Sequence, residues 1–233
     1  MKIALLGYGK MGKTIEKIAI ERGHEVVLKI SENIEDQDLE LADVAIDFSI
    51  PTAALNNIIT CCRNGLPVIS GTTGWLNEYE TAVRVCEEEK SAFLYASNFS
   101  IGVNLFFEIN KKLAKLIDPF QEYSAEIEEI HHTQKLDAPS GTAISLAEQI
   151  ISNSRYSGWQ LDNAGENEIP IIAKRIEDVP GTHNISYKSR VDTIEIKHTA
   201  HSREGFALGA VIAAEWIKGK RGVFTMKDVL SGL

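Results

Sequence analysis

The sequence predicts an α/β protein, with a parallel sheet in the first half of the chain and an α+β block with an open mixed sheet after it. Short apolar runs alternate with amphipathic stretches up to residue 99, which is the pattern of βα units. After Phe99, one long helical stretch is followed by several strand-like segments. The content of 44% hydrophobic and 24% charged residues is typical of a globular protein, so disorder and fibrous repeats are excluded.

The predicted strands of the first half are short, rich in Val, Ile and Leu, and bounded by Gly, Asp, Ser or Pro, as in a sheet buried on both faces. They span residues 2–6, 25–30, 44–48, 67–70 and 92–95. Between them, apolar residues such as Ile15, Ile18 and Ala19 recur at helical spacing. Residues 31–42 are acidic and too few for a full helix, so we expect a trimmed connection there.

The second half begins with a helix predicted over residues 104–117, followed by a strand at 124–132. A turn is expected at Gly181, and the alanine-rich segment 206–218 returns to a helix. Further strands with an antiparallel pattern are predicted at 169–176, 184–188 and 193–198.

Charge and cysteine content restrict the class of protein. The formal net charge is −9, which argues against a nucleic-acid partner and against an anionic membrane surface. No apolar run reaches the ~20 residues of a membrane-spanning helix, and the early charges Lys10 and Lys13 are unlike a signal peptide, so we expect a cytoplasmic location. The cysteines, Cys61, Cys62 and Cys86, lack metal or redox spacing and are expected to be small buried apolar residues.

The strongest motif is a glycine-rich turn between the first predicted strand and the first helix. Gly7 would allow the tight turn, Gly9 would let the backbone approach a pyrophosphate, and Gly12 would let the helix pack close to the sheet. The motif predicts a Rossmann-like dinucleotide-binding domain with phosphates at the helix N-terminus, against the alternative of a glycine turn kept only for packing. The candidate cofactor-binding residues are Gly7, Tyr8, Gly9, Lys10, Met11 and Gly12.

The residues leave open whether the cofactor is NADH, NADPH or both. An acid at the end of the second strand binds the ribose 2′-hydroxyl of NAD, whereas a base suits the 2′-phosphate of NADP. The deciding position lies within residues 30–32. Glu32 would favour NAD, Ser31 with nearby Lys10 would admit NADP, and Glu32 could equally be a solvated loop charge.

Two further loops follow predicted parallel strands at their carboxyl ends, where open α/β sheets bind ligands. Each loop alone is consistent with a simple turn or helix cap, and their shared placement favours a role around the nicotinamide ring. The candidate residues are Gly71, Thr72 and Thr73 in the first loop, and Ala96, Ser97, Asn98 and Phe99 in the second.

The densest polar cluster lies at the end of the predicted strand 124–132. His131, His132 and Lys135 offer a general acid and cations for an anionic substrate. A zinc site is a weaker interpretation, because adjacent histidines in a strand point to opposite faces, and we predict no metal. The alternative without a function is a polar surface hairpin.

A helix is predicted directly after this cluster, with Ser140 as its N-cap. The first N–H groups of that helix, from Gly141 and Thr142, would form an anion site suited to a carboxylate. The two predictions together describe a site for a small acidic molecule.

The chain resembles the dihydrodipicolinate reductase family of the diaminopimelate route to lysine. The stretches VAIDFS, GTTG, ASNFSIGVN, EIHHTQKLDAPSGTA, VPGTH and FALGA carry this resemblance over essentially the whole chain, and the block at residues 131–142 is its most specific part. The resemblance implies that His131 donates and accepts a proton and that Lys135 is a second catalytic cation. The substrate-binding residues that it implies are His132, Ser140, Gly141 and Thr142.

The same resemblance implies a domain organisation and an assembly. The C-terminal segment would return to the first domain, so that residues 1–99 and 204–233 form the dinucleotide-binding domain. Residues 100–203 would be an inserted substrate-binding and tetramerisation domain of a homotetramer. The glycine turn is shorter than in many members and has Lys10 where they have arginine, which touches the choice of cofactor but not the reaction.

The activity that the resemblance implies is an NAD(P)H-dependent reduction of a cyclic dicarboxylate, 4-hydroxy-tetrahydrodipicolinate. Two alternatives stay open on the residues alone. One is another two-domain dehydrogenase of an amino or keto acid, similar to an aspartate dehydrogenase. The other is a nucleotide sensor without catalysis, which the absence of a helix-turn-helix or basic segment in the sequence disfavours.

Overall fold

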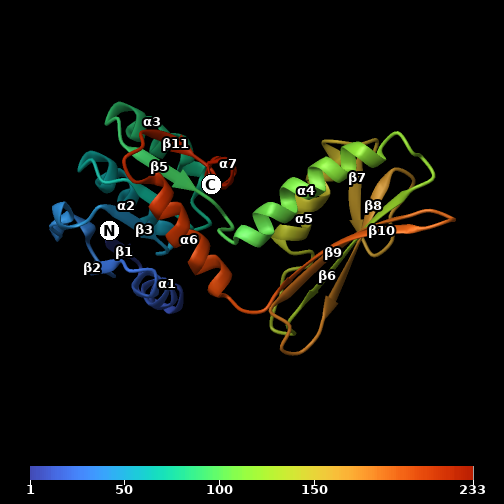
Figure 1. Cartoon of the computed structure of the whole chain (residues 1–233), viewed down its shortest axis with the longest axis horizontal. Coiled ribbons are helices and arrows are strands. Elements are labelled where there is room, and N and C mark those ends of the chain that lie inside the picture. The colour runs from blue at the N-terminus through green and yellow to red at the C-terminus, as the bar shows by residue number, and fades with distance from the viewer. Residues whose placement is uncertain (233) are drawn as a thin grey trace. The chain divides into compact units, whose positions relative to one another are not determined.

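The computed structural model describes residues 1–232, and its tertiary contacts divide the chain into two compact units. The first unit comprises Met1–Asn104 and the C-terminal segment from Glu204 onward, and the second comprises Leu105–Arg203. The elements near both ends of the chain therefore fold together, as the blue and red ribbons of the first unit show (Figure 1).

The first unit is built on a six-stranded sheet in which every pairing is parallel. Its order is β11-β5-β4-β3-β1-β2, so β1 lies between its two sequence successors. That reversal of strand order is the switch point at which α/β sheets bind ligands. The strands are β1 (Lys2–Leu6), β2 (Glu25–Ile30), β3 (Val44–Asp47), β4 (Val68–Ser70), β5 (Ala92–Tyr95) and β11 (Gly222–Phe224).

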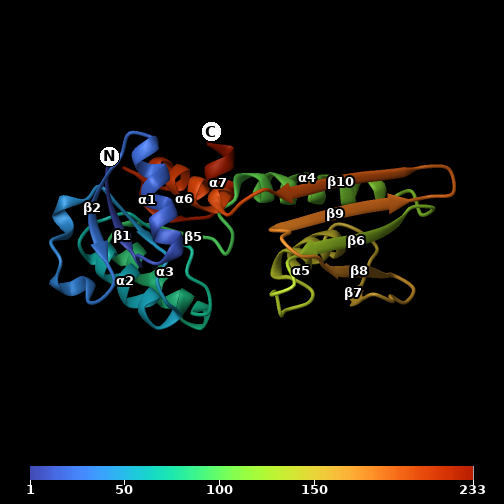
Figure 2. The same cartoon turned by 90° about the horizontal axis from the view of Figure 1, so that it is seen from below.

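Helices cover both faces of this sheet, with α1 and α6 on one face and α2 and α3 on the other (Figure 2). Short 3-10 turns at Ile34–Asp36 and Leu39–Leu41 form the trimmed connection expected after β2. A third such turn, Leu76–Glu78, precedes α3. The helices of this unit are α1 (Lys10–Glu21), α2 (Pro51–Arg63), α3 (Tyr79–Glu88), α6 (Glu204–Ile217) and α7 (Met226–Ser231).

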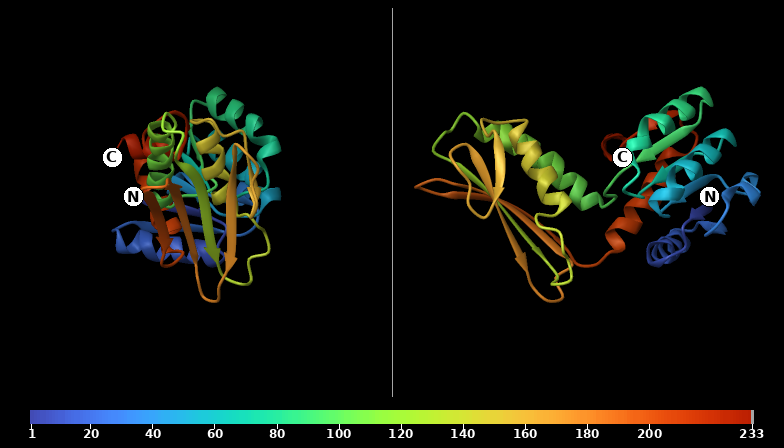
Figure 3. Two further views of the ribbon diagram at one scale, coloured as in Figure 1. Left: turned by 90° about the vertical axis from the view of Figure 1, so that its right-hand side faces the viewer. Right: turned by 180° about the vertical axis from the view of Figure 1, so that it is seen from behind.

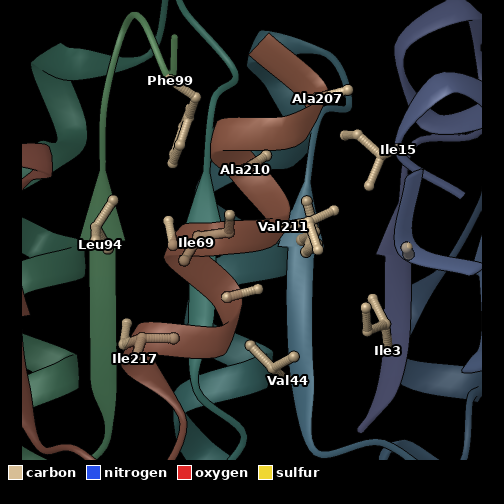
Figure 4. Packing of buried hydrophobic residues seen from close by; sticks show 14 of the residues in the cluster. Ile3, Ile15, Val44, Ile69, Leu94, Phe99, Ala207, Ala210, Val211 and Ile217 are labelled. Atoms are coloured by element: carbon tan, nitrogen blue, oxygen red, sulfur yellow. The ribbon is translucent and has the colours of Figure 1, made fainter. Parts of the chain in front are cut away.

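The C-terminal helix α6 packs directly on the sheet through small and branched side chains. Figure 4 shows Ala210, Val211 and Ile217 facing the apolar residues of β3, β4 and β5. A Cβ at Gly209 would lie 1.7 Å from the backbone oxygen of Phe99, so only glycine permits this close approach. The packing fixes the loop that follows β5 against α6.

The second unit has a mixed sheet of order β10-β9-β6-β8-β7. Helices α4 (Ile101–Ile117) and α5 (Gly141–Ile151) pack against one face of it (Figure 3). Along β6, buried and half-buried residues alternate, so Ala125, Ile127, Glu129 and His131 share the face toward the helices. The strands are β6 (Ser124–His131), β7 (Gly158–Leu161), β8 (Glu168–Arg175), β9 (Gly181–Lys188) and β10 (Thr193–Ala200).

The predicted fold class is confirmed, with corrections in the second unit. β8 was expected in an antiparallel pattern but pairs in parallel with both β6 and β7. Gly181 begins β9 instead of forming a turn, and α4 begins at Ile101 because Ser100 Oγ accepts the N–H of Val103 at 3.3 Å. The short elements β7, β11 and α7 were not predicted, because segments of three to six residues carry too little periodicity.

Two further expectations concern the cysteines and the membrane. Cys61, Cys62 and Cys86 are free and buried, as predicted. Within residues 1–232, none of the helices combines the length and the apolar character needed to cross a bilayer.

Candidate active site

The glycine-rich turn lies at the carboxyl end of β1, where it leads into α1. Gly7 has φ +90°, and a Cβ there would lie 2.2 Å from the backbone oxygen of Phe48. A Cβ at Gly12 would lie 2.4 Å from the oxygen of Gly7, so both positions require glycine for close packing. Gly9, the N-cap of α1, has nothing within 4 Å of an added Cβ. The space over Gly9 at the helix N-terminus fits a pyrophosphate group.

The remaining residues of this turn differ in their surroundings. Met11 is half-buried and packs against the core, whereas Lys10 is exposed in the first turn of α1. Tyr8 donates its hydroxyl to Glu16, and Lys29 of β2 forms an ion pair with Glu16 at 2.5 Å while lying 4.9 Å from the Tyr8 ring centre. The hydrogen bonds from Lys29 and Tyr8 lower the pKa of Glu16. The sequence did not single out Lys29.

The loop after β4 is held by a buried carboxylate that sequence reasoning missed. Asp47, the last residue of β3, is fully buried and accepts hydrogen bonds from Ser70 Oγ at 2.7 Å and Thr72 Oγ1 at 2.8 Å. It also accepts from Ser49 and Asn57. The carboxylate therefore ties together the carboxyl ends of β3 and β4. The sequence feature that could have indicated Asp47 is an acidic residue at the end of an apolar strand.

The predicted loop residues divide into buried anchors and exposed groups. Thr72 is buried, and a Cβ at Gly71 would lie 2.3 Å from the Phe48 ring, so both positions shape the loop. Phe99 is buried, with its ring centre 5.7 Å from that of Phe48. The backbone N–H of Ala96 donates to Ser70 at 3.2 Å, and Asn98 Oδ1 accepts the N–H of Ser100 at 2.9 Å. The side chains that remain exposed are Thr73 and Ser97.

The polar cluster of the second unit is organised around Glu129, a second buried carboxylate, which the sequence placed in the cluster without a role. Its side chain is fully buried on β6. Glu129 Oε2 accepts the N–H of Ser140 at 3.0 Å, and Oε1 lies 3.2 Å from Arg175 of β8. Oε2 also lies 3.5 Å from His131 Nδ1 and 3.7 Å from His183 Nε2 of β9.

Burial and charge set the protonation of this cluster. Burial alone would raise the pKa of Glu129, but hydrogen bonds from His183 and Ser140 outweigh burial and lower the pKa to about 2. Burial lowers the pKa of His131 from 6.5 to about 4, even though Glu129 acts in the opposite direction. At neutral pH, this structure therefore has an ionised Glu129 beside a neutral His131.

His131 is the last residue of β6, and His132 follows the strand in different surroundings. His131 is buried beside His183, with ring centres 5.1 Å apart. His132 is half-buried and lines a cavity of about 410 Å³ together with Thr133, Gln134, Glu177 and Arg203 among others. The structure therefore does not place both rings in one pocket.

Lys135 and the start of α5 lie in the loop after β6. Lys135 Nζ lies 2.7 and 2.8 Å from the two carboxylate oxygens of Asp137, and this hydrogen bond lowers the pKa of Asp137. Ser140 caps α5 by accepting the N–H of Ala143 at 3.2 Å, and its Oγ lies 3.1 Å from His183 Nε2. Gly141, the first residue of the helix, is exposed, and nothing lies within 4 Å of an added Cβ. Thr142 follows half-buried.

A parallel-sheet unit with a glycine turn at its switch point, combined with a second unit that presents histidine and lysine side chains, defines a two-domain pyridine-nucleotide-dependent oxidoreductase. The models of "Dihydrodipicolinate reductase, N-terminus" and "Dihydrodipicolinate reductase, C-terminus" match residues 1–99 and 102–230. The chain belongs to the dihydrodipicolinate reductase family.

Curated relatives and a solved structure agree with this membership. The 4-hydroxy-tetrahydrodipicolinate reductase of Christiangramia forsetii is 61% identical over 100% of this chain and 99% of its own length. That of Archaeoglobus fulgidus is 37% identical over 99% of this chain and all of its own. The dipicolinate-bound dihydrodipicolinate reductase of Paenisporosarcina sp. TG-14 has the same fold, with a TM-score of 0.78, 22% identity and 97% coverage of both chains.

Proposed function

We propose that the chain reduces 4-hydroxy-tetrahydrodipicolinate to tetrahydrodipicolinate with NADH or NADPH, in the diaminopimelate route to lysine. The observation that carries this proposal is that His131, Lys135 and the capped start of α5 follow one another at the end of β6 and in the loop after it. It supplies a proton carrier, a cation and a helix N-terminus, which are the groups that a small cyclic dicarboxylate needs. The other two-domain dehydrogenases and the sensor lack such support.

The cofactor would occupy the switch point of the first unit. The open space over Gly9 fits the pyrophosphate, and the loops at Gly71–Thr73 and Ala96–Phe99 fit the nicotinamide end. When bound, the nicotinamide supplies a hydride. Tyr8, Lys10 and Met11 would contact the cofactor from the turn itself.

The substrate would be held by the second unit through its two carboxylates. His132, Ser140, Gly141 and Thr142 are the proposed binding residues, since α5 begins among them. Lys135 would exchange its contact with Asp137 for a substrate carboxylate, because Asp137 is largely exposed and hydrated. That exchange would place a cation where negative charge develops.

His131 would carry the proton. Its pKa of about 4 means that the ring is neutral at physiological pH. A substrate with two carboxylates would raise the pKa of His131 on binding, so the imidazolium would form when it is needed. Because the hydride donor and His131 belong to different units, we expect a closed state during turnover.

The assembly and the location belong to the same proposal. We expect a homotetramer in which residues 100–203 provide both substrate binding and tetramer contacts, with residues 1–99 and 204–233 binding the cofactor. We expect the enzyme in the cytoplasm, since its substrates are metabolites of amino-acid synthesis.

A coupled assay tests the activity. The upstream synthase would generate the substrate from pyruvate and aspartate semialdehyde, and nicotinamide absorbance would be followed with NADH and with NADPH. We expect oxidation of at least one of the two. Oxidation of neither, or a higher rate with oxaloacetate and ammonia, would instead favour an aspartate dehydrogenase.

A further inference from the structure

A buried carboxylate lies directly behind the proposed proton carrier. Glu129 Oε2 is 3.5 Å from His131 Nδ1, and both groups are on the helix-covered face of β6. His131 Nδ1 is buried and has no hydrogen-bond partner at standard distance. Glu129 is therefore placed to determine whether this nitrogen carries a proton.

A neutral imidazole has one N–H and one lone pair, and their placement follows from the surroundings. A lone pair on Nδ1 would face an ionised carboxylate, which is repulsive, whereas an N–H on Nδ1 would be attracted to it. Hydrogen bonds of catalytic groups are often long without substrate and shorten in the complex. The arrangement therefore favours the tautomer with the proton on Nδ1.

Glu129 is itself held in place by two other donors. The N–H of Ser140 donates to Oε2 at 3.0 Å, and Arg175 donates to Oε1 at 3.2 Å. Arg175 is fixed in turn, since it also donates to the backbone oxygens of Lys135 and Asp137. One guanidinium thus supports both the carboxylate and the loop that carries Lys135.

The other ring nitrogen faces a position without a side chain. A Cβ at Gly181 would lie 3.2 Å from His131 Nε2 and 3.3 Å from its Cδ2. The backbone of Gly181 is not in the left-handed region, so its lack of a side chain is not a requirement of the turn. The glycine leaves room beside Nε2.

We infer that Glu129 is a positioning residue that keeps the proton of His131 on Nδ1 and presents Nε2, beside Gly181, to the substrate. This inference rests on the proposed function for its kinetic part only. Glu129 would also stabilise the imidazolium once Nε2 takes up a proton, in the manner of the carboxylate in a catalytic triad.

A metal ion is the competing use of the same groups. Ligand atoms of Glu129, His131 and His183 lie within 4.8 Å of one another. However, both carboxylate oxygens already accept hydrogen bonds from Ser140 and Arg175, and His183 Nε2 lies 3.1 Å from Ser140 Oγ. The cluster is therefore better described as hydrogen-bonded than as a metal centre.

Nitrogen NMR of the full-length protein, labelled with ¹⁵N-histidine, tests the tautomer directly. The His131 signals would be assigned by their loss in His131→Asn. In the wild type at neutral pH, we expect Nδ1 to be protonated and Nε2 to carry the lone pair. A proton on Nε2 would overturn the inference, and so would a change in these signals after treatment with a chelator, because an ion would then hold Nδ1.

Glu129→Gln tests the role of the carboxylate. Glutamine keeps the shape of the side chain but removes the negative charge that attracts a proton to His131 Nδ1, so the preference for the Nδ1 tautomer should weaken. We expect kcat to fall about 100-fold with little change in KM for the cofactor, and Glu129→Asp to recover part of the loss. Glu128→Gln is the matched control, since Glu128 lies on the opposite face of β6 and pairs with Lys174. A kcat for Glu129→Gln within twofold of wild type would contradict the inference.

Gly181→Ala provides a variant that keeps Glu129 intact and does not strain the backbone. We expect its methyl group to crowd Nε2 and lower kcat at least 10-fold while the proton stays on Nδ1. An unchanged kcat would show that Nε2 is not the reacting nitrogen. Absence of reductase activity in the wild type would contradict the proposed function alone, because the NMR result does not depend on turnover.

Discussion

At the scale of single residues, the two proposed catalytic side chains differ in their surroundings. His131 and Lys135 differ in this respect, because His131 is buried and neutral whereas Lys135 is paired with the largely exposed Asp137. A substrate carboxylate can displace Asp137 at little cost, since exposed ion pairs contribute only about 0–1 kcal/mol. We therefore expect both residues to respond to substrate, but for different reasons.

Replacing the two residues should affect turnover and leave cofactor binding intact. We expect His131→Asn and Lys135→Met each to lower kcat roughly 10²- to 10⁴-fold, the usual contribution of a general acid or base. The Kd for NADH or NADPH, measured by nucleotide fluorescence, should stay within twofold of wild type. Lys174→Met serves as the control, because Lys174 pairs with Glu128 on the opposite face of β6. A loss of cofactor affinity would contradict this prediction, because it would assign His131 and Lys135 to the cofactor site.

The same pKa shifts predict how stability depends on pH. The pKa of His131 falls from 6.5 to about 4 on folding, so the unfolded form binds a proton first as the pH drops. The contribution of His131 to the free energy of unfolding is fully present above pH 6.5 and is lost as the pH falls toward 4. The pKa of Glu129 falls from 4.5 to about 2, which adds a second loss of stability below pH 4.5.

Urea denaturation between pH 8 and pH 4, followed by tryptophan fluorescence, would measure this dependence. We expect the free energy of unfolding to decrease steadily below pH 6.5 in the wild type. His131→Asn should flatten part of the upper curve, since it removes one of the histidines whose pKa burial lowers from 6.5, while His198 remains. A wild-type curve that is flat between pH 6.5 and 4.5 would contradict the shift for His131.

At the scale of elements, two glycines of the glycine-rich turn serve different purposes, one in folding and the other in cofactor binding. A Cβ at Gly12 would meet the oxygen of Gly7 at 2.4 Å, whereas one at Gly9 meets nothing within 4 Å. We expect Gly12→Ala to lower Tm by several degrees. Gly9→Ala should leave Tm within about 2 °C of wild type but weaken cofactor binding at least 10-fold, because its methyl group occupies the pyrophosphate space. Thermal melts and cofactor titrations of both variants test this, and equal Tm values would contradict it.

The end of β2 should decide between the two cofactors. The strand ends at Ile30, so Ser31 and Glu32 follow it with exposed side chains. We expect Glu32→Ala to lower KM for NADPH several-fold, because like charges about 4 Å apart in water repel by about 1 kcal/mol. We expect it to raise KM for NADH, because the acceptor for the ribose 2′-hydroxyl is lost. Comparing both KM values in wild type and variant tests this. No change in either KM would assign Glu32 to the solvent.

The helices and strands could be predicted from the sequence better than the buried residues that hold the site in place. Periodicity located β1, β2 and β5 to the residue, and the strand predicted at 124–132 ended one residue beyond the observed β6. Asp47 and Glu129 were missed because each holds groups from strands far away in the sequence. His183 and Arg175 reach Glu129 only through the pairing of β9 and β8 with β6, and the parallel pairing of β8 was predicted wrongly.

For the whole molecule, the local distribution of charges matters more than the net charge. The net charge is −9, yet the proposed cofactor and substrate are anions. The second unit sets Lys135 and Arg175 in the loop and strand beside His131, whereas the cavity that Arg203 lines also holds Glu177 and Asp178. The first unit offers the N-terminus of α1 to phosphates. Local cations and helix ends therefore oppose an unfavourable overall field.

The edge of the second sheet is where we expect copies of the chain to meet. β10 is the edge strand, and its backbone can pair with another strand on the side away from β9. Apolar side chains near it are exposed, with Ile194 at 38% and Val191 at 75%. We expect wild-type protein to sediment as a tetramer of 25.7 kDa chains and Ile194→Lys to dissociate it and lower specific activity at nanomolar concentration. Ile20→Lys on α1 is the matched control, since Ile20 is 57% exposed in the first unit. A monomeric wild type, or equal dissociation by Ile20→Lys, would contradict this.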